Sequence, residues 1–217
     1  MLPLANSTYY PEDLTENAIQ VIGENDGVFN NEDYILFYAE GVENWNTESQ
    51  TNLNLFDTKS YYYITDAGNE GKRISTIIQP SGNSTLELNT FDDYQYHEID
   101  QTNIAHLGRQ WFGESFDINQ DQDFAFTFPN LDTSVPVKIA VTAASAAFTP
   151  TSFAVSANGQ NIGTISFNAL VSSSDVKFYT GKLPANATFT GSESVKIKLT
   201  YNNNGVPDQK DTWTISI

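Results

Sequence analysis

The chain has 217 residues, with 27 acidic and 10 basic side chains and no cysteine. Its formal net charge of −17 repels phosphate backbones and anionic membranes, so we expect neither nucleic acid nor a membrane surface as a partner. The lack of cysteine excludes a disulfide framework, a thiolate metal site and a cysteine nucleophile within this sequence. No apolar run is long enough to span a membrane, and Met1–Leu4 do not resemble a signal peptide, so any export signal is expected outside this sequence.

Short strand patterns occupy the first part of the chain. They are rich in β-branched and aromatic residues, and turn residues separate them. In chain order they are Ala18–Ile22, Tyr34–Ala39, Tyr61–Thr65, Arg73–Ile78 and Thr85–Leu88. The apolar run Tyr34–Ala39 predicts a strand that is buried in a core.

From Phe91 onward the strand patterns become longer and alternate more strictly. They cover Phe124–Phe128, Val137–Thr142, Phe153–Ala157, Gln160–Phe167, Val176–Leu183, Val195–Tyr201 and Thr212–Ile217. Asn158-Gly159 predicts a type I′ hairpin turn, because both residues tolerate positive φ. Helical signals are few, and the best is Asp100–Gly108, with Asp100 as the N-cap.

These patterns predict a mainly β chain. We expect an antiparallel β-sandwich domain of jelly-roll type over residues 91–217. A small β-rich or mixed subdomain over residues 1–90 is expected to precede it.

The acidic loop Gly23–Asp33 is the first candidate site. An EF-hand register fails there, because placing Gly27 at position six of the loop puts Ile22 at position one. Turn chemistry explains the polar residues without an ion. A calcium ion remains the alternative interpretation, and calcium is the only cofactor that we consider. Its candidate ligands are Asp26, Asn30, Glu32 and Asp33.

Two other sets of residues suggest metals less strongly. Asp117, Asn119 and Asp121 have the spacing of a calcium loop, but the glycine that such a loop needs is missing, which favours a solvated turn. His97 and His106 are the only histidines, and they stand farther apart in sequence than the pairs in zinc motifs. We therefore expect each histidine to be structural or exposed.

The segment Gly108–Phe116 predicts a structural clamp formed by Arg109, Trp111 and Glu114. In it, Arg109 pairs with a carboxylate beneath aromatic cover. The candidate carboxylates are Glu114, Glu98 and Asp100. The sequence contains no nucleophile elbow and no glycine-rich phosphate loop, so we predict no catalytic site in this chain.

Aromatic content leaves a second function open. Trp45, Trp111 and Trp213, with 11 tyrosines, could form a sugar-stacking face on a carbohydrate-binding β-sandwich, although core packing is the usual role of such residues. A hydrolase that uses two opposed carboxylates is a third interpretation.

Four stretches, taken in order, resemble a known family. They are GENDGVFNNEDYILFYAEG at Gly23–Gly41, YYYITDAGNEGKRI at Tyr61–Ile74, FDDYQYHEID at Phe91–Asp100 and GRQWFGESF at Gly108–Phe116. The hairpin segment Phe153–Ile165 is similar too. Together they resemble the region upstream of the peptidase domain in gingipain-family cysteine peptidases of Bacteroidetes. The nearest subgroup is the PorU-type sortases of the type IX secretion system. Leu107 departs from the family, which more often has a small hydroxyl residue there.

The resemblance implies a role for the chain. Such sortases are surface cysteine peptidases that cleave the C-terminal sorting domain of exported cargo and join the cargo to a lipopolysaccharide anchor. Their Cys–His pair belongs to the peptidase domain that follows this region, so no catalytic residue is carried over to this chain. The resemblance thus implies a non-catalytic accessory domain, extracellular or at the outer-membrane surface. Its partners would be the downstream peptidase domain, cargo or secretion-system proteins.

Overall fold

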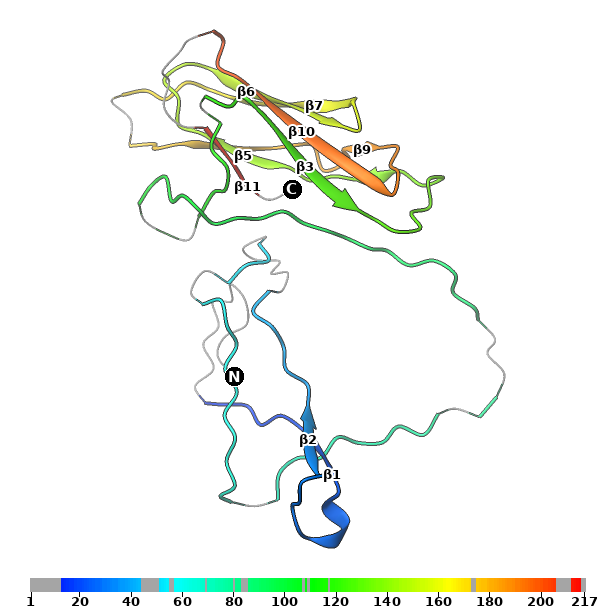
Figure 1. The fold of residues 1–217 in the computed structure, drawn as a ribbon. Coiled ribbons are helices and arrows are strands. Elements are labelled where there is room, and N and C mark those ends of the chain that lie inside the picture. The colour runs from blue at the N-terminus through cyan, green and yellow to red at the C-terminus, as the bar shows by residue number, and fades with distance from the viewer. Residues whose placement is uncertain are drawn as a thin grey trace. The chain divides into compact units, whose positions relative to one another are not determined.

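The structure is a computed structural model. It describes residues 13–43, 51–54, 57–68, 70–79, 81–82, 86–106, 108, 110–116, 118–172, 175–205 and, for the backbone alone, 212–215. The chain separates into two compact units, Met1–Phe91 and Asp92–Ile217, which are considered one at a time (Figure 1).

The first unit contains a two-stranded antiparallel sheet of β1 (Ile19–Ile22) and β2 (Tyr34–Phe37). The two strands pair without a break in register. A short 3-10 turn, η1 (Glu24–Asp26), lies in the loop between them. Gly23 and Gly27 flank this turn in the left-handed conformation, with φ of 95° and 71°, which glycine adopts at low cost.

Several strand predictions in the first unit are wrong. Tyr61–Thr65 forms no strand, and neither do the described residues of Thr85–Leu88. Arg73–Ile78 contributes only a parallel bridge between Arg73 and Ile19. These residues have β propensity, but a strand also needs a partner at its edge, and the described part of this unit supplies few.

The prediction that β2 is buried is also wrong. Tyr34, Ile35, Leu36 and Phe37 are 50%, 43%, 47% and 39% exposed. Successive side chains of a strand point to opposite faces, so β2 is exposed on both of its faces. Burial would require a second layer of structure, which apolar sequence alone does not provide.

The second unit is β-sandwich-like and built from antiparallel sheets, which confirms the predicted fold class. One sheet has the strand order β3–β10–β6–β7, and another has the order β11–β5–β8 (Figure 1). The strands are β3 (Asp121–Thr127), β5 (Thr142–Ser145), β6 (Thr151–Ala157), β7 (Gln160–Phe167), β8 (Tyr179–Lys182), β10 (Ser194–Asn202) and β11 (Thr212–Ile215). The short strands β4 (Val137–Lys138) and β9 (Thr188–Phe189) pair with each other.

Both larger sheets contribute to one hydrophobic core. Alternate residues of β6 point into it, with Phe153, Val155 and Ala157 fully buried. The Phe153 ring lies 4.9 Å from the Phe116 ring and 5.4 Å from the Tyr201 ring. From the side of the three-stranded sheet, the same core receives Val141, Ala143 and Leu183. Burying a valine, leucine or phenylalanine side chain stabilises a fold by about 1.5–3 kcal/mol.

Local turn and helix predictions had different outcomes. Asn158 and Gly159 have φ of 47° and 79°, which confirms the predicted type I′ turn of the β6–β7 hairpin. The helix expected over Asp100–Gly108 is not formed in the described residues. Thr102 pairs there with Phe112 through two backbone hydrogen bonds of 2.8 and 2.9 Å. Backbone pairing between distant residues therefore outweighed the weak helical propensity of this segment.

None of the helices in the described part of the chain is long and apolar enough to cross a membrane.

Candidate functional site

The acidic loop between β1 and β2 uses its polar side chains to form turns. Asp26 Oδ1 accepts a hydrogen bond from the Val28 N–H at 2.9 Å, and Asn30 Oδ1 accepts one from the Glu32 N–H at 3.0 Å. Asp33 Oδ2 accepts a third from the Asn30 N–H at 2.8 Å. The first two bonds are those of Asx turns, and the third reaches back three residues along the loop. Among the described residues, no group of three or more His, Cys, Asp or Glu side chains could hold a metal ion, so calcium in this loop stays a prediction.

The second candidate calcium loop, Asp117 to Asp121, ends in a residue that contacts a neighbouring strand. Asp121 lies on β3, and its carboxylate accepts hydrogen bonds from Thr200 Oγ1 at 2.5 Å and Lys198 Nζ at 3.0 Å, both on β10. These bonds, that of Thr200 foremost, lower the pKa of Asp121. Asp117 lies outside the described residues. The described geometry at Asp121 is that of a cross-strand surface contact.

The predicted clamp is described in part. Arg109 lies outside the described residues, so its pairing stays a prediction. Trp111 is half-buried. Glu114 Oε1 lies 2.6 Å from His97 Nε2, and the His97 ring lies 4.9 Å from the Phe124 ring. Glu114 is thus bound to a residue that the sequence analysis did not assign to it.

The His97–Glu114 pair joins two parts of the segment that precedes β3, and the His97 ring contacts β3 through Phe124. The two residues are 17 positions apart, and no local pattern in the sequence signals their contact. A carboxylate bound to an imidazole is the orienting half of a catalytic triad, but this sequence has no cysteine to act as the nucleophile of a cysteine peptidase. The other histidine, His106, is exposed in a turn with φ of 55°. A structural role for His97 stays a prediction.

Burial affects one acid in the same segment. Asp100 is half-buried, and its removal from water raises the pKa of its carboxyl group. Glu98, close to it in sequence, is buried. Both were candidate partners of the arginine in the predicted clamp.

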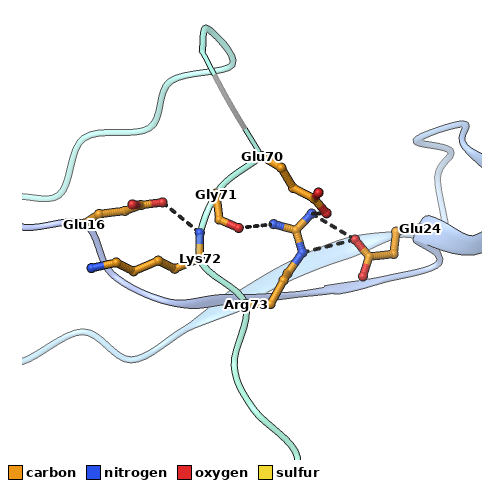
Figure 2. Close-up of polar contacts among 6 residues, drawn as sticks. All are labelled: Glu16, Glu24, Glu70, Gly71, Lys72 and Arg73. Atoms are coloured by element: carbon orange, nitrogen blue, oxygen red, sulfur yellow. Dashed lines mark hydrogen bonds and ion pairs between the residues drawn. The ribbon is translucent and has the colours of Figure 1, made fainter.

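In the first unit, polar contacts hold residues 70–73 beside β1 (Figure 2). Arg73 Nη2 and Nε donate to Glu24 Oε2 at 3.1 and 3.3 Å, and Arg73 Nη1 donates to the Gly71 carbonyl at 3.0 Å. Glu16 Oε1 accepts a hydrogen bond from the Lys72 N–H at 2.8 Å. Figure 2 shows these side chains on both sides of the backbone that carries Arg73. The contacts fix this segment even though it forms no regular strand.

The same segment occupies one edge of the ribbon. The Ile19 N–H donates to the Lys72 carbonyl at 2.9 Å, and the Ile74 N–H donates to the Ile19 carbonyl at 2.9 Å. The outer edge of β1 is therefore covered at Ile19. No such cover is seen on the outer edge of β2, which pairs only with β1 among the described residues.

The open strand extends into a short exposed segment, and we refer to Tyr34–Tyr38 as the apolar edge. Tyr38 is 76% exposed. Tyr62 contacts one end of this segment, because its ring lies 5.6 Å from the Phe37 ring and its hydroxyl donates to the Glu40 carbonyl at 2.8 Å. Sequence reasoning identified this strand but took it for core. The apolar edge is the strongest candidate for a functional surface in the described chain.

A scan of protein-family models finds no match, and a search of curated proteins finds none. Among solved structures, part of the chain is similar to part of the crystal structure of dimeric latent PorU from Porphyromonas gingivalis. The TM-score is 0.48 and the sequence identity is 17%, over 56% of this chain and 12% of that chain. The alignment therefore spans only a small share of that chain's length.

Proposed function

We propose that this chain is a non-catalytic accessory domain of a surface, gingipain-like peptidase of the PorU type, and that it acts by binding. The observation that carries the proposal is the apolar edge, in which each of the four residues of β2 is exposed. Unpaired apolar strands are used in proteins for recognition and are costly to leave in water. The four ordered stretches that resemble the gingipain family point to the same role.

The proposal also covers location and partners. The chain is placed outside the cell or at the outer-membrane surface through its parent protein. Its partners are the peptidase domain of the parent, cargo or secretion-system proteins. With no cysteine, the chain itself contributes no nucleophile to a cysteine peptidase.

Deleting the region from the parent peptidase tests this role. We expect the remaining chain to be produced but to lose surface localisation or cargo processing, because the binding surface is gone. Immunoblots of processed cargo and surface protease protection measure the two outcomes. The parent carrying Ile118→Lys, a surface change outside the apolar edge, is the control. If folding, localisation and processing are all unchanged by the deletion, the proposed role is wrong.

A carbohydrate-binding module is the second candidate, and exposed tyrosines favour it. Tyr34, Tyr38, Tyr61 and Tyr63 are 50%, 76%, 45% and 72% exposed. Aromatic faces of this kind can stack on sugars. Trp45 and the side chain of Trp213 lie outside the described residues. This candidate predicts glycan-array binding that Tyr38→Ala or Tyr63→Ala abolishes.

A further inference from the structure

β2 is short, at four residues, but it carries no lysine, proline or bulge to protect its edge from pairing. Natural edge strands carry lysine, proline or a bulge, or are covered by other structure. β2 reads Tyr-Ile-Leu-Phe, and its register with β1 is unbroken. Its outer edge is therefore suited to accept another strand through backbone hydrogen bonds.

Among the described residues, only one edge of the ribbon is left open to such pairing at its Ile19–Phe37 end. There, the backbone contacts of residues 72–74 and the ion pair of Arg73 with Glu24 close the β1 side at Ile19 (Figure 2). An added strand at that end would have to lie along β2.

The acidic residues near this edge indicate that a strand added there would be positively charged. Residues 13–43 contain no lysine or arginine, and their acidic residues are Asp13, Glu16, Glu24, Asp26, Glu32, Asp33, Glu40 and Glu43. Asp33 directly precedes the apolar edge, and Glu40 follows it closely. In an extended chain these two carboxylates stand about 23 Å apart, at about 3.3 Å per residue.

We propose that the outer edge of β2 binds an extended peptide segment whose centre is apolar and whose ends carry lysine or arginine. Backbone pairing and apolar contact supply the affinity, and the acidic flanks supply the selectivity. This inference rests on the proposed binding role, which it makes more specific by naming the chemistry of the partner. A second copy of the chain fits less well, because two acidic edges with the same flanks would repel each other.

Fluorescence anisotropy of the full 217-residue chain with labelled peptides tests the inference. One peptide alternates valine and threonine and carries lysines at both ends. A second has glutamates in place of the lysines. A third is the lysine peptide with alternate backbone nitrogens methylated, which removes the donors needed for strand pairing. We expect the lysine peptide to bind, and the other two to bind at least about tenfold more weakly, which corresponds to about 1.4 kcal/mol.

Two variants with the same change in charge locate the site. Leu36→Lys places a positive charge on the edge and is expected to weaken binding of the lysine peptide about tenfold. Ile118→Lys changes an exposed residue of the second unit, which is 95% exposed, and is expected to leave binding unchanged. Hydrogen exchange of the wild-type chain should show slower exchange in β2 when the lysine peptide is added, which tests the site without any variant.

Several results would overturn the inference. They are equal binding of the methylated and unmethylated peptides, equal loss of affinity in both variants, unchanged exchange in β2, and a dimer through β2 in light scattering. Glycan binding at this edge would overturn it as well. A failed peptide experiment leaves the deletion result intact, so the failure of this inference and that of the proposed function can be told apart.

Discussion

At the residue scale, Gly23 controls the acidic loop. A Cβ at this position would lie 1.7 Å from Asp33 Oδ1, and the residue has φ of 95°. Gly27 also has positive φ, but a Cβ there would meet open space. We predict that Gly27→Ala costs about 1–2 kcal/mol through backbone strain alone, and that Gly23→Ala costs clearly more, because the clash adds to the strain.

Hydrogen exchange in β1 and β2 measures this difference, since the loop joins these two strands. Equal exchange rates in the two variants would show that the contact with Asp33 does not matter. A calcium titration followed by the same exchange measurement provides the corresponding check of the predicted metal site.

Asp100 gives a prediction for pH dependence. Burial raises the pKa of its carboxyl group above its usual value of 3.8, so the folded chain holds this proton more tightly than the unfolded chain. The stability of the fold should therefore fall as the pH rises from 3.8 through the raised pKa, and stay lower above it. Asp100→Asn should reduce this fall. Urea unfolding at several pH values measures it, and the same pH profile in both proteins would contradict the prediction.

At the element scale, β7 and β8 approach closely because Gly181 lacks a side chain. A Cβ there would lie 2.5 Å from Ile165 Cγ2 and 3.1 Å from Phe167 Cε1, both on the facing strand β7. We predict that Gly181→Ala lowers the free energy of unfolding by about 1–3 kcal/mol through overpacking. Gly163→Ala is the matched control, since its Cβ would lie 3.3 Å from the flexible end of Leu183.

Urea denaturation of the two variants tests this packing argument. Gly163→Ala should lose less stability, because the Leu183 side chain can move aside. If the two variants are equally stable, the contact between these two strands is looser than the structure indicates.

At the scale of the whole molecule, we predict that one of the two units folds by itself and the other does not. Residues 92–217 contain the large buried core, whereas the first unit has a two-stranded sheet, which is marginal by itself. We predict that residues 92–217 alone unfold cooperatively, and that residues 1–91 alone do not. Leu199→Ala should cost the same, about 2–5 kcal/mol, in residues 92–217 and in the full chain. Unequal losses would contradict this independence.

The sequence by itself missed β9, and it missed most of β5 because it predicted one strand over Val137–Thr142. It did determine the long strands β3, β6, β7 and β10 and the β6–β7 turn. Both depend on local information, namely alternation of apolar residues and the tolerance of Asn158 and Gly159 for positive φ. Tertiary structure alone decided that β2 is exposed, and that Glu114 contacts His97. The physical reason is the same in both cases. Burial and long-range pairing depend on which segments meet in space, and a local pattern of residue types carries no record of that.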